Sequence, residues 1–183
     1  MSDRASEAEA KAHRGPSPKA IQEDAPPIPK APGQGISLAR VLDAPRARVY
    51  RAWTTPEDFA RWFGGRLEVP VERLTMDVRP GGRWSLVMRT PDGGHLPFFG
   101  VYQEVAEPER LVFSLKDTTS AEESTGEIVT LLLTDLGDRT EMVFHQGGGH
   151  LSAEEYRRSE EGWAGFFDRL ADLLAEENGT PSP

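Results

Sequence analysis

The spacing of hydrophobic and polar residues changes along the chain, and each spacing predicts a different kind of element. Residues 36–42 alternate apolar with small or polar side chains, which predicts a first strand. From residue 71 onward a period of two returns, broken by turn residues such as Pro80 and Gly81. Short connections of this kind favour antiparallel hairpins. The expected strands of this meander cover residues 71–78, 82–89, 95–105, 110–116, 127–134 and 140–145.

Two short helices are predicted between the first strand and the meander. The first begins at Pro45, whose fixed φ suits a first helical turn, and an apolar stripe follows it. In the second, Thr55 is the expected N-cap and Pro56 takes the first helical position. Asp58 is placed to return the capping contact, and Gly64 ends the helix.

The last part of the chain predicts one long amphipathic helix. Ser152 and Glu155 form a capping box, and the helix is expected to run through Glu176. Gly162 and Gly165 both lower helix propensity, so we expect them to admit the close approach of a strand or of a ligand. The apolar side of this helix contains Tyr156, Trp163, Phe166, Phe167, Leu170, Leu173 and Leu174.

Together these elements predict an α+β domain over residues 36–177. We expect a curved antiparallel sheet around a long C-terminal helix, with two short helices after the first strand. Such packing leaves an apolar cleft between sheet and helix, where small molecules tend to bind. Residues 1–35 are rich in Pro and Ala and contain no Leu, Val, Phe, Trp or Tyr, which predicts a disordered tail. A longer, mobile loop is expected over 117–126 and a frayed end over 178–183.

Charge and composition narrow the class of protein. The chain has 30 acidic residues against 21 Lys and Arg, a net charge of −9. The charges of residues 1–35 cancel, so the excess lies in the predicted domain, which argues against a nucleic-acid partner. The absence of cysteine excludes disulfides and thiolate-bound metals. No apolar run suits a signal peptide or a membrane-spanning helix, so we expect a cytoplasmic protein without membrane insertion.

Few residues suggest catalysis or a cofactor. His145 and His150 flank a glycine run, but two imidazoles lack the third protein ligand that a catalytic zinc site normally has. The run also lacks the Lys-Ser or Lys-Thr of a phosphate-binding loop, and no serine lies in a nucleophile elbow. We therefore expect no metal and no cofactor, and an enzyme is the less favoured class. The carboxylates on predicted strands, most of them expected to face solvent, are Asp77, Glu104, Glu127 and Glu141.

Aromatic residues are the best candidates for a binding site. Most large rings are expected in the core, as in ordinary domains. Rings on the sheet and on the long helix form the two walls of the expected cleft, and polar residues near its mouth could orient a ligand. The expected ligand-binding residues are Trp84, Phe98, Trp163, Phe166 and Phe167 in the lining, with Arg83, Arg89, His95 or Gln103 near the mouth.

A series of short motifs between residue 36 and about residue 176 resembles one protein family. On these motifs the chain resembles the activator-of-Hsp90-ATPase-homologue-like family, which belongs to the START-like, helix-grip superfamily. The resemblance implies a helix-grip fold with a deep cavity between the sheet and the long helix. The motifs are Ala44-Pro45, Val49-Tyr50, Ala52-Trp53-Thr54-Thr55-Pro56-Glu57, Trp62-Phe63, Arg79-Pro80-Gly81-Gly82-Arg83-Trp84, Gly100-Val101-Tyr102-Gln103-Glu104-Val105, Pro108-Glu109-Arg110-Leu111-Val112-Phe113 and Gly162-Trp163.

The resemblance implies three functional hypotheses. The first is a non-enzymatic protein that binds a bulky hydrophobic small molecule, in one version a toxic natural product. Some bacterial members of the family protect producers of enediyne antibiotics, and the drug diradical then abstracts hydrogen from the protein, which is cleaved and consumed. The second hypothesis is a co-chaperone-like module that contacts an Hsp90-type ATPase, and the third is a cyclase-type enzyme. Glycines available for hydrogen abstraction are Gly100, Gly126, Gly137 and those at 147–149.

Overall fold

Seven strands and three α-helices make up the fold in a computed structural model, which describes residues 35–118, 126–148 and 151–178. The strands form one antiparallel sheet in the order β1-β7-β6-β5-β4-β3-β2, which confirms the predicted α+β class. Most of the predicted tail, the tip of the predicted loop and the chain end lie outside the described residues. The elements are β1 (Gly35–Leu42), α1 (Arg46–Thr54), α2 (Pro56–Trp62), the 3-10 helix η2 (Val71–Arg73), β2 (Thr75–Met76), β3 (Arg83–Arg89), β4 (His95–Ala106), β5 (Arg110–Asp117), β6 (Glu127–Asp135), β7 (Thr140–Gly147) and α3 (Ala153–Asn178).

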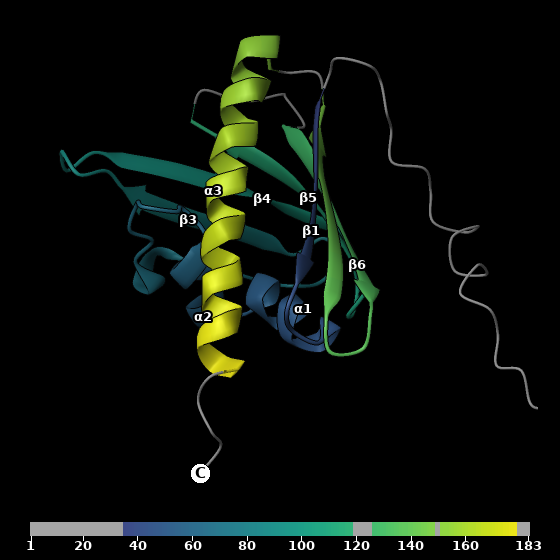
Figure 1. The fold of residues 1–183 in the computed structure, drawn as a ribbon. Coiled ribbons are helices and arrows are strands. Elements are labelled where there is room, and N and C mark those ends of the chain that lie inside the picture. The colour runs from purple at the N-terminus through teal and green to yellow at the C-terminus, as the bar shows by residue number, and fades with distance from the viewer. Residues whose placement is uncertain (1–34, 119–125, 149–150, 179–183) are drawn as a thin grey trace, which may run out of the picture.

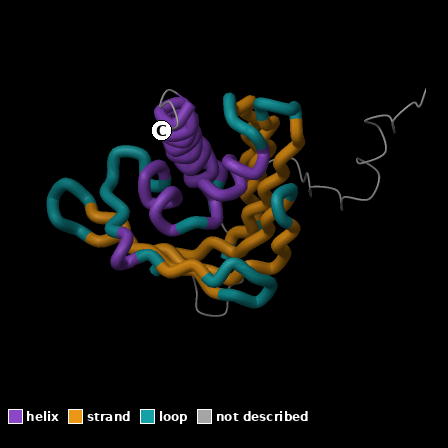
Figure 2. Tube along the Cα trace, turned by 90° about the horizontal axis from the view of Figure 1, so that it is seen from below, coloured by secondary structure: helices purple, strands orange, loops and turns teal. Residues whose placement is uncertain are grey.

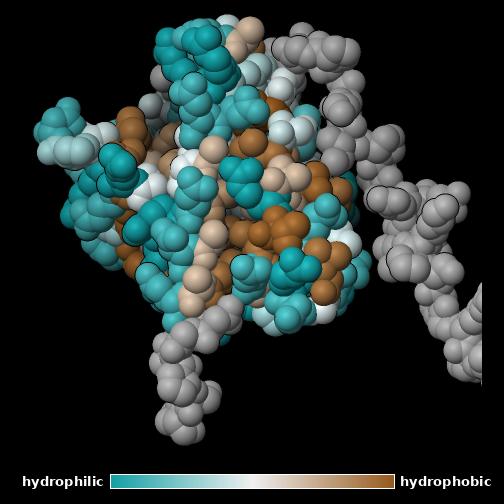
Figure 3. Space-filling view, in the orientation of Figure 1, coloured by the Kyte–Doolittle hydropathy of each residue, from teal (hydrophilic) through white to brown (hydrophobic). Residues whose placement is uncertain are grey.

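The sheet curves around α3. Figure 1 shows α3 crossing in front of the strands, and Figure 2 shows the α-helices together on the concave side of the bent sheet. On the face seen in Figure 3, many of the residues along α3 are hydrophilic, and hydrophobic residues show on either side of the helix. The concave face of the sheet is therefore the interior of the domain, and α3 closes it.

Alternation along the strands decides which side chains face α3. In β6, Val129, Leu131 and Leu133 face inward and are buried. Across the ladder, Phe144 and Met142 of β7 pair with Leu131 and Leu133 and are also buried. The apolar side of α3 packs into the same core, as its spacing predicts. The buried residues of that side are Tyr156, Trp163, Phe167, Leu170, Leu173 and Leu174.

Trp53, near the end of α1, is the centre of an aromatic cluster. The side chain is 1% exposed, and its nearest ring is that of Trp62, with 4.7 Å between the ring centroids. Offset and edge contacts of this kind add to the free energy gained by burying the rings. Rings from both short helices, the sheet and α3 thus meet at one point. The rings within 6.4 Å of Trp53 are Phe59, Trp62, Phe113, Phe144, Trp163 and Phe167.

Trp62 also completes the end of α1. The carbonyl of Ala52 would normally accept from the amide four residues later, but that residue is Pro56, which has no N–H. The indole Nε1 of Trp62 donates to this carbonyl at 2.9 Å instead. The hydrogen bond satisfies a buried acceptor and holds α2 against α1.

Only two residues of the predicted strand over 71–78 form a strand. Val71–Arg73 forms η2, and only Thr75–Met76 pairs with β3. Pro70 has a fixed φ, and the amide of Arg73 donates to its carbonyl at 2.9 Å, which closes a tight turn. Val71 is 41% exposed, so the apolar alternation that suggested a strand included a residue outside the core. The other predicted strands match to within two residues at each end.

The capping box of α3 is confirmed. The amide of Glu155 donates to Ser152 Oγ at 3.3 Å. In return, the amide and hydroxyl of Ser152 donate to Glu155 Oε2 at 2.7 Å and 2.6 Å. The helix therefore begins where the sequence predicts, at the position that the box satisfies.

The predicted capping contacts of α2 are wrong, although Pro56 does begin the helix. Within the described part of the chain, Thr55 makes no side-chain capping hydrogen bond. Asp58 is buried instead, with its carboxylate 3.2 Å from guanidinium nitrogens of Arg48 and Arg51. Two cations on α1 therefore lie within ion-pairing distance of this carboxylate, and Asp58 faces α1 and not the N-terminus of its own helix.

The two glycines of α3 do not admit a strand. A Cβ added at Gly162 or Gly165 would meet no atom within 4 Å, so this part of the prediction is wrong. Both positions are exposed, but Gly162 lies at the edge of a cavity and Gly165 does not.

Candidate functional site

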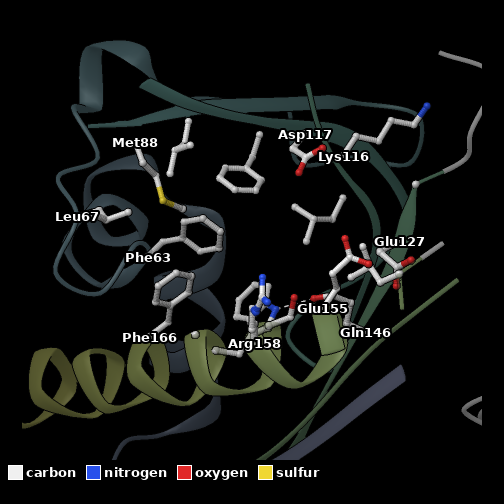
Figure 4. Close-up of a pocket in the computed structure, with 18 residues that line it drawn as sticks. Phe63, Leu67, Met88, Lys116, Asp117, Glu127, Gln146, Glu155, Arg158 and Phe166 are labelled. Carbon is white, nitrogen blue, oxygen red and sulfur yellow. Dashed lines mark hydrogen bonds between the residues drawn. The ribbon is translucent and has the colours of Figure 1, made fainter. Parts of the chain in front are cut away.

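A cavity of about 670 Å³ lies between α3 and the concave face of the sheet. Its lining residues are drawn in Figure 4. Strands β3 to β7 supply one wall, α3 supplies the other, and the chain after α2 closes one end. The volume falls within the range of roughly 300–1,000 Å³ that is usual for small-molecule sites.

One end of the cavity is apolar. Phe63 and Leu67, which follow α2, lie near Met88 of β3 and Phe166 of α3 in Figure 4. The ring of Phe63 is 5.2 Å from that of Phe166 and 5.5 Å from that of Trp163, measured between centroids. This end offers a ligand van der Waals contact with rings and aliphatic side chains. The other apolar lining residues are Leu96, Phe98, Leu115 and Leu151.

The opposite end is polar. Asp117 at the end of β5, Glu127 at the start of β6 and Glu155 in the first turn of α3 bring carboxylates to it. Gln146 of β7 adds an amide, and the ammonium of Lys116 points away from the other labelled side chains in Figure 4. The cavity therefore separates an apolar end from a polar end.

Glu127 places a buried carboxylate at the polar end. It lies two residues before Val129 in β6, so both side chains face inward, and it is 5% exposed. The hydroxyl of Tyr156 on α3, itself buried, donates to Glu127 Oε2 at 2.7 Å. Such a charge-assisted hydrogen bond holds the start of α3 to the sheet at the cavity wall.

Gln146 and Trp163 are joined across the cavity wall. The indole Nε1 of Trp163 donates to Gln146 Oε1 at 2.6 Å, and the two side chains are 5% and 2% exposed, respectively. This bond fixes the rotamers of both lining residues before any ligand arrives, which lowers the entropy lost on binding.

Glu155 keeps negative charge at the mouth. The hydroxyl and amide of Ser152 donate to its carboxylate, and these hydrogen bonds lower the pKa of Glu155 below its usual value. Arg158, one turn further along α3, is 71% exposed and pairs with Glu154 at 3.2 Å. The guanidinium is therefore largely solvated, whereas the carboxylate of Glu127 is enclosed.

Three of the side chains predicted to bind a ligand line the cavity: Phe98, Trp163 and Phe166. Trp84 and Phe167 are buried in the core outside the lining, and the indole of Trp84 donates to the carbonyl of Ser114 at 3.1 Å. The remaining predicted residues are exposed and do not line the cavity, because they face away from α3 or lie at a strand end. These residues are Arg83, Arg89, His95 and Gln103.

The sequence analysis did not select Gln146 or Glu127 as ligand-binding residues. Both have the parity of buried neighbours: Gln146 follows Phe144 by two residues, and Glu127 precedes Val129 by two. Residues two apart in a strand face the same side of the sheet, so a polar residue two positions from a predicted core residue is expected to point inward. This rule would have identified both residues.

The described residues include no group of three His, Asp or Glu side chains placed to hold a metal ion. His145 faces away from the cavity, because it alternates with Gln146, and its Nδ1 is hydrogen-bonded to Ser37 Oγ at 2.9 Å. His150 lies outside the described residues. None of the described helices has the length and apolar character needed to cross a bilayer.

We expect His145 to make the fold less stable in mild acid. Burial lowers the pKa of His145 in the folded protein, while a hydrogen bond to the backbone of Ile36 and the charge of Glu127 oppose the shift. A histidine in an unfolded chain has a pKa of about 6.5. As the pH falls below this value, the unfolded chain binds a proton at this residue before the folded protein does. The contribution of neutral His145 to stability is therefore fully present above the unfolded pKa and is lost as the pH falls toward the folded pKa.

Urea unfolding at pH values between about 7 and about 5 measures this effect. The free energy of unfolding should fall more steeply for the unchanged protein than for His145→Gln. His95→Gln, a change at an exposed position on β4, is the matched control and should keep the original slope. Equal slopes for His145→Gln and the unchanged protein would contradict the prediction.

A curved antiparallel sheet that grips a long helix over a ligand-sized cavity defines a helix-grip domain of the START-like class. The family model described as Activator of Hsp90 ATPase homolog 1-like protein matches residues 43–175, and the chain belongs to this family. The fold suggests small-molecule binding, and membership of the family does not name a ligand. Comparison with curated proteins gave no match.

Solved structures of bacterial proteins share the fold. A protein from Chromobacterium violaceum is 27% identical, with a TM-score of 0.67 over 77% of this chain and 97% of its own. An AHSA1-like protein from Aeromonas hydrophila is 21% identical, with a TM-score of 0.65 over 81% of this chain and 97% of its own. CalU16 from Micromonospora echinospora is 24% identical, with a TM-score of 0.58 over 78% of this chain and 77% of its own.

Proposed function

We propose that the protein binds a bulky, largely apolar small molecule in the cavity between the sheet and α3. The observation that supports this most directly is the cavity itself, about 670 Å³ with aromatic side chains at one end. Burying an apolar ligand there would gain roughly 25 cal/mol for each Å² of apolar surface removed from water. The polar groups at the other end would then orient the ligand.

Titration with N-phenyl-1-naphthylamine, a neutral dye that fluoresces in apolar sites, tests the proposal. We expect saturable enhancement at one dye per chain, with competition by small molecules that native mass spectrometry finds bound after incubation with host extract. Fluorescence no greater than that given by an equal concentration of unrelated globular protein would refute the proposal.

A second candidate is sequestration or inactivation of a toxic natural product, the version that the family resemblance implies. Of the glycines considered for hydrogen abstraction, Gly126 lines the cavity, and Gly162 of α3 lines it too. An aryl diradical held there would take a Cα hydrogen, which forms a C–H bond on the ligand and leaves a carbon radical on the chain. Dissolved dioxygen would add to that radical and leave as hydroperoxyl with the amide hydrogen, which gives an acylimine. Water would then hydrolyse the acylimine and break the N–Cα bond, leaving a primary amide on one fragment and a glyoxylyl end on the other.

Incubation with an activated enediyne in air, followed by intact-mass measurement, tests this candidate. Fragments with masses that correspond to cleavage at Gly126 or Gly162 are expected, together with protection of DNA present in the same mixture. An intact chain and unprotected DNA would exclude it, while dye binding would still stand.

The other two hypotheses make different predictions. A cyclase-type enzyme would need polar groups that converge in the cavity. The buried, hydrogen-bonded pair of Glu127 and Tyr156 is one such feature. The co-chaperone alternative predicts a complex with an Hsp90-type protein and a changed ATPase rate. An unchanged rate and no complex would remove it.

A further inference from the structure

Gln146 is a buried polar side chain at the polar end of the cavity. It lies on β7, where Phe144 and Met142 share its inward parity and are fully buried. The side chain is 2% exposed. A primary amide at such a position requires partners for both its oxygen and its nitrogen.

Trp163 determines which way the amide of Gln146 faces. An indole nitrogen only donates hydrogen bonds, so the atom of Gln146 at 2.6 Å from Trp163 Nε1 must be the oxygen. The usual ambiguity between amide oxygen and nitrogen is therefore resolved by chemistry. The NH2 group is left as the part of the amide available to other partners.

Within residues 35–118, 126–148 and 151–178, no protein group accepts a hydrogen bond from the side-chain nitrogen of Gln146. Both N–H groups can thus donate to a molecule in the cavity. A wholly apolar ligand that displaced water from these donors would leave them unpaired, so a ligand that supplies an acceptor gains affinity over one that does not.

Nearby charge restricts the kind of acceptor. The carboxylates of Glu127 and Asp117 line the same end of the cavity, and Glu127 is 5% exposed. Of the two cations in the lining, Lys116 directs its ammonium away from the other labelled side chains in Figure 4, and Arg158 is 71% exposed and paired with Glu154. A second anion would meet like charge in an enclosed site, so an uncharged acceptor is favoured.

We propose that Gln146 selects ligands that present a neutral oxygen acceptor, such as a ketone or quinone carbonyl, beside an apolar ring system. This inference rests on the proposed function, because it names the ligand class for the same cavity. Trp163 acts as the positioning residue: it holds the amide oxygen and directs the two N–H donors toward the ligand carbonyl. The apolar end of the cavity receives the rings.

Three probes of one ring system test the proposal. 9-Fluorenone has a carbonyl where fluorene has a methylene group, and fluorene-9-carboxylate presents an anion. Equilibrium dialysis of the full chain against each probe measures affinity without relying on tryptophan fluorescence. We expect 9-fluorenone to bind about 10- to 100-fold more tightly than fluorene, and more tightly than the carboxylate.

Two variants test whether Gln146 causes the preference for 9-fluorenone over fluorene. Gln146→Leu should lower the ratio of 9-fluorenone to fluorene affinity toward one, because the two amide N–H donors are lost. Gln103→Leu is the matched control, since it makes the same change at an exposed glutamine outside the cavity. It should keep the original ratio.

The outcomes separate this inference from the function on which it rests. If 9-fluorenone and fluorene bind equally to the unchanged protein, the inference is overturned and apolar binding stands. If neither probe binds, both fail. Tighter binding of the carboxylate than of 9-fluorenone would overturn the choice of a neutral acceptor. Should Gln146→Leu fail to fold, the ratio for the unchanged protein still decides.

Discussion

Gly162→Leu is expected to abolish most ligand binding without harming the fold. Gly162 lines the cavity, and a Cβ added there would meet no atom within 4 Å, so a leucine side chain extends into open space. Overlap with a bound ligand should lower dye affinity by about 10- to 100-fold. The free energy of unfolding should rise by about 0.5–1 kcal/mol, because leucine has a higher helix propensity than glycine.

Gly165→Leu is the matched control for this change. It lies on the same helix, is exposed and also has no neighbour within 4 Å, but it does not line the cavity. It should raise stability by a similar amount and leave dye binding unchanged. The same titration and urea unfolding measure both variants. Equal affinities for Gly162→Leu and Gly165→Leu would show that the dye binds elsewhere.

The elements with the strongest local pattern were the most predictable from the sequence. The apolar spacing of α3 and its Ser152–Glu155 box fixed both the type and the start of the helix, because each depends on residues close in sequence. Residues 71–78 had a strand-like pattern, but Pro70 closes a turn there, and only tertiary contacts decide which pattern forms.

The candidate site was less predictable, because it depends on which residues of distant strands face α3. Phe98, Trp163 and Phe166 were selected as large rings on the expected walls, and they line the cavity. Gln146 and Glu127 were not selected, since a polar residue in a strand usually faces solvent. Their inward direction follows from the register of β6 and β7, which pairing across the sheet sets.

Composition also misses the distribution of charge that matters to a ligand. The net charge of −9 describes mainly exposed side chains. At the polar end of the cavity, the buried carboxylate of Glu127 lies with those of Asp117 and Glu155, and Gln146 adds an amide. Their effect is large because the enclosed site has a lower effective dielectric constant than the surface. The proposed preference for a neutral acceptor therefore rests on a few lining residues, and the whole-chain charge does not reveal it.

Trp53→Ala is expected to cause the largest loss of stability of the variants considered. Trp53 is 1% exposed and its ring contacts belong to α1, α2, the sheet and α3 together. Truncating a buried tryptophan to alanine costs about 3–5 kcal/mol, a large part of the roughly 5–15 kcal/mol that stabilises an ordinary domain. Urea unfolding measures the change. Phe99→Ala, at a ring that is 41% exposed on β4, should cost far less.

A pair of tryptophan-to-phenylalanine changes then separates packing from hydrogen bonding. Trp53 Nε1 is buried without an acceptor among the described residues, whereas Trp62 Nε1 donates to the Ala52 carbonyl that Pro56 leaves unpaired. Trp53→Phe removes an unsatisfied donor along with part of the ring, so the two effects partly offset. Trp62→Phe loses similar packing and also leaves a buried carbonyl unpaired, which adds about 1–3 kcal/mol. Trp62→Phe should therefore be the more destabilising of the two by about that amount in urea unfolding. Equal losses would show that the indole hydrogen bond contributes nothing to joining α1 and α2, and that ring packing alone holds them together.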